Sequence, residues 1–296
     1  MYTSTEDARS DLFLSGAVYV VGPAVVGILT DLLRVDGIPL VVAVLAVVTP
    51  IVTTALVPFL LMRYRGESLG QYGYGAGLPP NFGIGLLLAA PIVVAAVIAG
   101  IVVGEPLSAL GVMQIIDPGG EPYAVPLAVG RILNWLGLGF LAVYATVKAR
   151  DAFRSDFRTV RDETIWLGKI LAAVAAVAVS IALLLMLPGA PGLVGAGLTL
   201  LPILLLPLGV AGSIVLLLRT LRGPSATSRA TMLTPVVLLA VGPFQLSFSG
   251  TSLALSVWSA SLYAGVGLMI AALQESRRSA LACFGLTLAI ALLTPL

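Results

Sequence analysis

The sequence has very little charge: only 10% of its 296 residues are Asp, Glu, Lys or Arg. Soluble domains carry roughly 25% charged residues, whereas 59% of this chain is hydrophobic and its mean hydropathy is +1.08. A water-soluble fold could not cover its surface with so few charges, so lipid must solvate part of it. We therefore expect the lipid bilayer as the main partner, and we expect no nucleic acid.

Histidine is absent, and Cys283 is the single cysteine. Without histidine the usual zinc sites lack their main nitrogen ligand, and Ser-His-Asp or Cys-His catalytic sets are impossible. One cysteine forms no intrachain disulfide and builds no iron–sulfur cluster alone. We expect no cofactor and no metal.

Acidic residues are also missing from the middle of every apolar run. Intramembrane proteases of the aspartyl type and proton carriers normally place Asp or Glu there. The sequence therefore argues against paired intramembrane carboxylates and against catalysis.

What the chain has in abundance is long apolar runs. A helix needs about 20 mainly apolar residues to cross a hydrocarbon core of roughly 30 Å, and lipid offers backbone groups no partner, which favours helices. We predict an all-α fold, a polytopic transmembrane helix bundle of about nine helices (eight are possible) that forms a single integral membrane domain over residues 1–296. The expected spans are 11–33, 38–62, 83–104, 125–147, 165–187, 193–218, 231–249, 252–274 and 279–296.

The basic residues alternate between the links in a way that orients the chain. They follow the second, fourth, sixth and eighth spans, and the opposite links hold almost none. Since cytoplasmic loops carry the excess of Lys and Arg, we expect a cytoplasmic N-terminus and, with nine helices, an extracellular C-terminus. No A-x-A-like cleavage site follows the first run, so we expect that helix to be retained. The Arg-, Ala- and Gly-rich composition suggests a prokaryotic cell membrane.

A basic segment follows the fourth span, and we expect it at the membrane surface. Its pattern fits a short helix lying on the cytoplasmic leaflet, with arginines near anionic headgroups. The alternative is an ordinary positive-inside loop. The basic residues of this segment are Lys148, Arg150, Arg154, Arg158 and Arg161.

Polar side chains inside the expected spans are the candidates for a binding site. Arg131 lies six residues into the fourth span, and Asn134 shares its helix face. The pair could bind an anionic group, or Arg131 could extend to the headgroups while Asn134 bonds a neighbouring helix. Near the eighth span, helical spacing aligns a row of hydroxyls that could line a polar path or pack helices closely. The hydroxyl row is Ser252, Ser256, Ser259 and Tyr263, and Gln245 is a further polar candidate before it.

The link after the second span carries a family resemblance. The run Arg65-Gly66-Glu67-Ser68-Leu69-Gly70-Gln71-Tyr72-Gly73 resembles the R-G-x-S-L-x-x-x-G-like link of the CAAX-protease and bacteriocin-processing (CPBP) intramembrane protease family, whose members are all-helical and similar in size. The resemblance covers about the first third of the chain. The family's catalytic E-E-x-x-x-R would fall where this chain reads Ala145-Thr146-x-x-x-Arg150, with both glutamates missing. The resemblance implies the scaffold without the chemistry.

Two functional hypotheses follow from these observations. The first is a non-enzymatic membrane protein, either a small-solute permease or a partner-binding membrane subunit that could include a homo-oligomer. The second is a catalytically degenerate scaffold, similar to the CPBP family, that binds peptides or a protein partner.

Overall fold

The computed structural model describes residues 4–34, 38–75, 78–103, 124–153, 200–222, 229–244 and 253–293. Every regular element in these ranges is helical, so the predicted all-α fold is confirmed. The long helices are α1 (Thr5–Leu33), α4 (Leu78–Val103), α6 (Ala124–Ala152) and α12 (Leu253–Arg277). The shorter helices are α2 (Pro39–Pro50), α3 (Val57–Tyr64), α9 (Leu206–Arg222), α10 (Arg229–Val241) and α13 (Ala280–Leu293).

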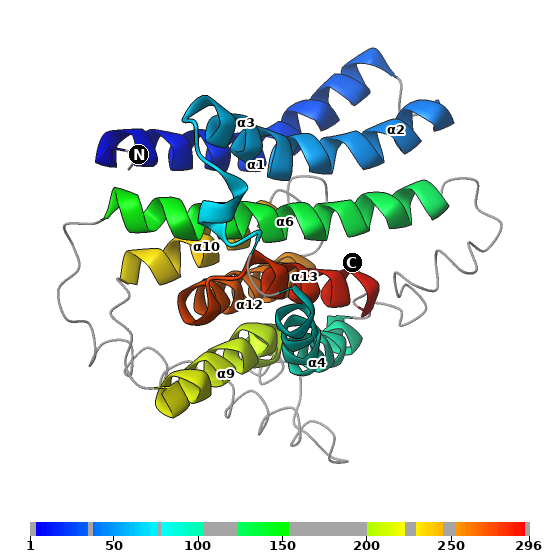
Figure 1. The fold of residues 1–296 in the computed structure, drawn as a ribbon. Helices are drawn as coiled ribbons and strands as arrows, with labels where there is room; N and C mark the ends of the chain where they lie inside the picture. Colours follow the sequence, from blue (N-terminus) through cyan, green and yellow to red (C-terminus); the bar gives the residue numbers. More distant parts are fainter. Residues whose placement is uncertain are drawn as a thin grey trace, which may run out of the picture.

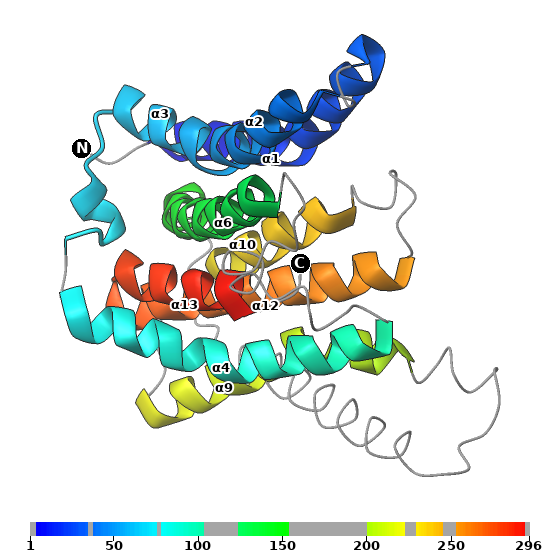
Figure 2. The same cartoon turned by 90° about the vertical axis from the view of Figure 1, so that its right-hand side faces the viewer.

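The helices stack in four layers (Figures 1 and 2). In Figure 2, α1, α2 and α3 form the upper layer, α6 and α10 the next, α12 and α13 the third, and α4 and α9 the last. Helix α6 joins the first layer to the rest, because it contacts α1 and α2 on one side and α10, α12 and α13 on the other. The hydrophobic core therefore lies around α6, α12 and α13.

Within the described ranges, five segments are long and apolar enough to cross a membrane: Thr5–Leu33, Leu40–Tyr64, Pro80–Val102, Val125–Ala152 and Ala254–Arg277. They correspond to the first, second, third, fourth and eighth predicted spans. Helix α13 has 14 residues, which is about 21 Å at 1.5 Å per residue. That length is too short to cross the hydrocarbon core alone. The predicted span 165–187 lies outside the described residues.

The second span is not a single regular helix. Helix α2 ends at Pro50, a π-helix η1 follows over Ile51–Leu56, and α3 continues the same direction. Proline lacks an N–H, so Pro50 leaves the carbonyl of Ala46 without its helical donor. Gly130 of α6 lies against that carbonyl, and any Cβ at position 130 would clash with it. The proline and the glycine together bring α2 and α6 unusually close.

Helix α10 covers only the first part of the predicted span 231–249, and residues 245–249 lie outside the described residues. Helix α10 ends at Val241, and Gly242–Phe244 forms a short 3-10 helix η5. Pro243 explains the end, because its ring clashes with the preceding turn and it cannot donate to the helical ladder. Pro235, by contrast, stays inside α10.

Charged side chains connect the helices at one end of the bundle. Arg65, after α3, meets Asp11 at the start of α1. Arg219 near the end of α9 pairs with Glu275 near the end of α12, with 2.7 Å between Nη2 and Oε2. Nη1 of Arg277 donates to Oδ1 of Asn81 on α4 at 3.2 Å. The basic helix ends that alternate along the sequence thus gather on one side of the fold, and we call this side the charged end.

Candidate functional site

The start of α1 places two acidic side chains at the charged end. Ser4 caps the helix, and its hydroxyl accepts a hydrogen bond from the backbone N–H of Asp7 at 3.1 Å. Negative charge in the first turn complements the helix dipole, which suits Asp7. Asp11 lies one turn further on the same face, and it is almost fully buried against the bundle.

The link after α3 brings a second pair of charged residues to the same place. Arg65 and Glu67 lie on either side of Gly66, whose φ of 69° is a conformation that glycine adopts easily. A 3-10 helix η2 follows over Leu69–Tyr72. Gly73 then anchors the link to the α12–α13 turn, because its carbonyl accepts from the N–H of Ala280 at 3.2 Å.

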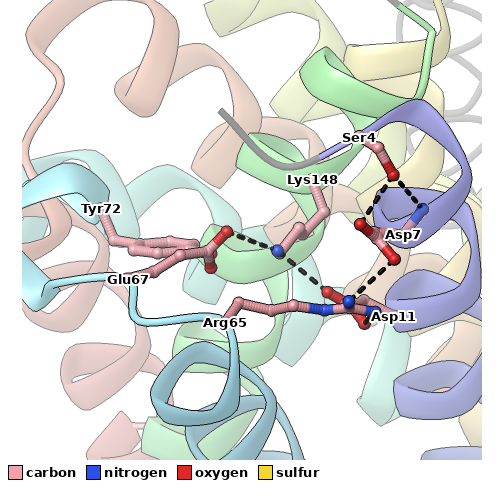
Figure 3. Close-up of polar contacts among 7 residues, drawn as sticks. All are labelled: Ser4, Asp7, Asp11, Arg65, Glu67, Tyr72 and Lys148. Atoms are coloured by element: carbon pink, nitrogen blue, oxygen red, sulfur yellow. Dashed lines mark hydrogen bonds and ion pairs between the residues drawn. The ribbon is translucent and has the colours of Figure 1, made fainter. Parts of the chain in front are cut away.

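Lys148, near the end of α6, lies at the centre of these charges (Figure 3). Its Nζ is 2.7 Å from Oε1 of Glu67 and 3.0 Å from Oδ2 of Asp11. The Nη2 of Arg65 is 3.1 Å from Oδ1 of Asp11, and its Nη1 is 2.8 Å from Oδ1 of Asp7. We call Asp11, Arg65, Glu67 and Lys148 the ion cluster.

Two tyrosine rings cover the ion cluster. Tyr72 stacks on Tyr144 of α6 with ring centroids 5.7 Å apart and an interplanar angle of 10°. The ammonium of Lys148 lies 5.5 Å from the centroid of the Tyr144 ring, which is within the range of a cation–π contact. The hydroxyl of Tyr72 donates to Oε2 of Glu67 at 2.5 Å. The rings therefore shield the charges and also bond to one of them.

The electrostatics of the link follow from these contacts. Burial, and next the hydrogen bond to Glu67, raise the pKa of Tyr72 well above its usual value, so its hydroxyl stays a donor. The hydrogen bond to Asp11 raises the pKa of Arg65, and its guanidinium stays charged. Two cations thus face two buried carboxylates, which is the compensation that a buried charge needs.

The exposed fractions of the side chains separate the ion pairs that contribute strongly to stability from the one that contributes weakly. The side chains of Lys148 and Asp11 are 0% and 2% exposed, and that of Glu67 is 8% exposed. Asp7 is 42% exposed, so its pair with Arg65 is screened by water and contributes little. Breaking a buried pair by removing one partner typically costs about 3–5 kcal/mol because the other charge is left uncompensated.

Lys148, the first residue of the predicted surface segment, is buried inside the bundle and not exposed. Helix α6 does not end with the apolar run at Val147 but continues to Ala152, which turns Lys148 into the bundle. Arg150 is partly buried near the end of the same helix. The other residues of the predicted surface segment, Arg154, Arg158 and Arg161, lie outside the described residues.

The structure also brings together two carboxylates that the sequence analysis did not single out. Asp11 and Glu67 share Lys148, although neither lies in the middle of a span. Sequence reasoning missed them because charges near span ends normally face water. A usable signal was present: Ser4, Asp7, Asp11 and Ser15 recur at helical spacing on α1, which predicts one polar face.

The predicted polar candidates around Arg131 partly come together. The Nδ2 of Asn134 on α6 donates to the Tyr263 hydroxyl on α12 at 3.4 Å, and Arg131 is near enough to Tyr263 to interact electrostatically. The rings of Trp135 and Tyr263 meet edge to face at 4.7 Å. The structure therefore brings three of the candidates into one polar group.

Two of the remaining candidates lie within the described residues, and both are enclosed. Ser256 and Ser259 of α12 are buried at 0% and 1% exposure. Their enclosure fits the packing role of small hydroxyl residues between membrane helices. Gln245 and Ser252 lie outside the described residues.

A cavity of about 560 Å³ lies between α1 and the α2–η1 segment. Its walls are almost entirely apolar, since the only lining side chains with a polar atom are Thr49 and Thr53, and both threonines are part of the second span. The Oγ1 of Thr53 donates to the Thr49 carbonyl at 2.8 Å, so it is not directed at a ligand. The cavity lining is as follows: Ala17, Val18, Val21, Gly22, Val25, Val26, Leu45, Val48, Thr49, Val52 and Thr53.

No group of three or more His, Cys, Asp or Glu side chains that could hold a metal ion occurs within the described ranges.

Comparisons of the chain with protein-family models, with curated proteins and with solved structures found no match. The functional argument therefore rests on the geometry of the ion cluster and its neighbours.

Proposed function

We propose that the chain is a non-enzymatic, multi-pass protein of the cell membrane that works as a small-solute permease. The ion cluster is the observation that carries this proposal. It joins α1 and the link after α3 to α6, where the first layer meets the rest of the bundle. A buried ion pair contributes little net stability, and its best-attested use is to specify one arrangement of helices.

A permease needs a contact that holds its groups of helices in one arrangement, and in this role we call the ion cluster the latch. Alternating access works largely by rocking one group of helices against another, and the first layer is a natural moving group. In α1 and in the second span, only 11% of the residues of the central apolar stretch are buried inside the bundle. The corresponding shares are 61% in α6 and 78% in α12. With the N-terminus in the cytoplasm, the ion cluster closes the inner end, and parting the layers lets water solvate its charges.

The test is uptake into liposomes that contain the purified chain. Labelled alanine, glutamate, arginine and glucose sample the main charge classes of small solute. Arg9 and Phe153 offer a site for fixing α1 to the end of α6, because the guanidinium carbon of Arg9 lies 5.7 Å from the centroid of the Phe153 ring and neither residue is fully buried. Joining Arg9→Cys and Phe153→Cys with a short bismaleimide should abolish uptake. Each single variant treated with the same reagent is the control. Uptake of no solute above protein-free liposomes would refute the permease.

The polar group around Arg131 is the proposed contact for the solute. Arg131→Gln should raise the half-saturating solute concentration if this group binds solute, and Ser256→Ala tests the hydroxyl row in the same way. Variants that leave the uptake of every transported solute unchanged would remove this assignment while leaving the permease itself standing.

The second candidate is a partner-binding membrane subunit, and the weak burial of α1 and the second span favours it. Purification in a mild detergent separates the two candidates, since a partner protein recovered in fixed proportion supports the subunit. The alternative hypothesis, from another class, is the catalytically degenerate scaffold similar to the CPBP family, which binds peptides or a protein partner. The link that carries that resemblance supplies Arg65 and Glu67 to the ion cluster, and the kinship stays a prediction.

A further inference from the structure

The far end of the link after α3 is anchored to the core of the bundle. The Tyr72 carbonyl accepts a hydrogen bond from Nε2 of Gln274 on α12 at 3.3 Å. The Gly73 carbonyl accepts from the N–H of Ala280, at the start of α13, at 3.2 Å. Gly73 has a φ of 86°, and a Cβ at this position would clash with the carbonyl of Arg278. The link therefore lies directly on the turn between α12 and α13.

Aromatic contacts fix the same end of the link to α6 and α13. The ring of Tyr74 contacts Phe140 of α6 and Phe284 of α13, with centroids 5.6 Å and 5.7 Å apart. These separations are within the range of favourable aromatic pairs. Tyr72 also stacks on Tyr144 of α6. Residues 69–74 therefore belong with α6, α12 and α13 rather than with the first layer.

The near end of the link belongs to the first layer instead. Gly66 and Glu67 close α3 with a Schellman motif, in which the N–H of Glu67 donates to the Met62 carbonyl at 2.9 Å. The next turn begins at Ser68, whose carbonyl accepts from the N–H of Gln71 at 3.1 Å. The backbone torsions between these two turns, ψ of Glu67 and φ of Ser68, belong to neither. The boundary between the first layer and the core therefore falls at the Glu67–Ser68 peptide.

This boundary divides the ion cluster into two charge-balanced halves (Figure 3). Asp11 and Arg65 both belong to the first layer, and their charged atoms are 3.1 Å apart. Lys148 belongs to the core, and Glu67 lies next to the boundary, where the core residue Tyr72 donates to its carboxylate. Rotation at the boundary displaces the adjacent Glu67 little, so its side chain stays within reach of Lys148. Of the ion pairs in the cluster, the Lys148–Asp11 pair is the one that spans the two halves.

We propose that the Glu67–Ser68 peptide is a hinge on which the first layer turns away from the core. The turn breaks the Lys148–Asp11 pair, whereas the Arg65–Asp11 and Lys148–Glu67 pairs stay formed. Each half then keeps one cation and one carboxylate, so neither half is left with an uncompensated charge. Hinges are typically a few loop residues that absorb a change in φ and ψ. The purpose of the motion rests on the permease proposed above, but the hinge itself does not.

The test measures distances between two spin labels by pulsed electron paramagnetic resonance, on the full chain in liposomes. Ser10, Gln71 and Arg278 are exposed, and the buried Cys283 stays unlabelled. Labels at Ser10→Cys and Arg278→Cys form the layer pair, which reports the position of α1 relative to the core. Labels at Gln71→Cys and Arg278→Cys form the link pair. Both pairs are measured in the otherwise unaltered chain and together with Asp11→Asn.

Asp11→Asn should shift the layer pair alone. The substitution weakens the ion pair that spans the two halves, while Arg65 keeps its pair with Asp7 and Lys148 keeps its pair with Glu67. The chain therefore stays folded, and we expect a second, longer distance in the layer pair. The link pair should keep one unchanged distance. Glu67→Gln is the matched comparison, because it leaves the Lys148–Asp11 pair in place and should add no longer distance.

Three results would overturn the hinge. A longer distance in both pairs would place the link with the first layer. No change in either pair would show that the Lys148–Asp11 contact does not hold the two halves together. A longer distance in the layer pair with Glu67→Gln as well as with Asp11→Asn would show that both pairs to Lys148 break. The measurement uses no solute, so the expected distances in liposomes that take up nothing would refute the permease alone.

Discussion

The Nζ of Lys148 and the Oε1 of Glu67 lie 2.7 Å apart, although 81 residues separate them in the chain. Lys148 belongs to a long apolar helix, and Glu67 belongs to the link between the second and third spans. The contact joins the first layer of the bundle to α6 at the charged end. Because both side chains are buried, removing one of them leaves the other charge uncompensated. The role of the ion cluster can therefore be tested by single substitutions.

Removing the central cation should destabilise the chain strongly. Lys148→Met leaves Asp11 and Glu67 buried together without their shared partner, and we expect a loss of about 3–5 kcal/mol in the free energy of unfolding. Arg63→Met is the matched control, since Arg63 is exposed just before the same link. Denaturant unfolding in detergent measures both. A loss for Lys148→Met no larger than that for Arg63→Met would show that the ion cluster is not buried as described.

A version of the ion cluster with three of its four charges removed gives the complementary result. Asp11→Asn, Glu67→Gln and Lys148→Met in one chain leave Arg65 as the charged member, and Arg65 keeps its pair with Asp7. Such replacements are often neutral or stabilising, so the triple variant should be more stable than Lys148→Met alone. If the ion cluster is the latch, the triple variant stays folded, but its rate of solute uptake into liposomes differs from that of the unaltered chain.

The two carboxylates that face Arg65 should contribute very differently. Asp7→Asn removes a pair that is 42% exposed on the acid, and we expect only a small effect on stability because water screens the pair. That effect should vanish near 1 M salt, where the screening length falls to about 3 Å. Asp11→Asn removes the buried carboxylate, so its larger effect should persist at high salt. Equal effects, or equal salt dependence, would contradict the difference in burial.

More of the fold than of the candidate site could be predicted from the sequence. Apolar runs of membrane-crossing length predict the ends of α1, α4, α6 and α12 to within six residues, because unsatisfied backbone groups in lipid cost so much free energy that a helix is required. The irregular turn after Pro50 and the early end of α10 depend on local packing around prolines, which the run length does not encode. The ion cluster depends on three segments meeting at one end, and only the polar face of α1 hinted at it.

The contact between α6 and α2 should tolerate no side chain. Gly130→Ala places a Cβ against the carbonyl of Ala46, and overpacking of this kind typically costs about 1–3 kcal/mol. Gly27→Ala on α1 is the matched control, because nothing lies within 4 Å of the added Cβ. There the loss of backbone freedom in the unfolded chain should instead stabilise by about 0.4–1 kcal/mol. Opposite signs in the two unfolding curves are the expected result, and destabilisation by both would point to a general intolerance of substitution.

The orientation of the chain can be tested with single cysteines, because Cys283 is buried and gives a silent background. Helix α1 has 29 residues, about 43 Å at 1.5 Å per residue, so its ends extend beyond a hydrocarbon core of roughly 30 Å. Leu33→Cys lies at one end and Arg63→Cys at the charged end, and both native side chains are exposed. A membrane-impermeant maleimide should label Leu33→Cys in intact cells and Arg63→Cys only in inverted vesicles. Labelling of Arg63→Cys in intact cells would place the ion cluster outside, and the proposed inner gate would then be wrong.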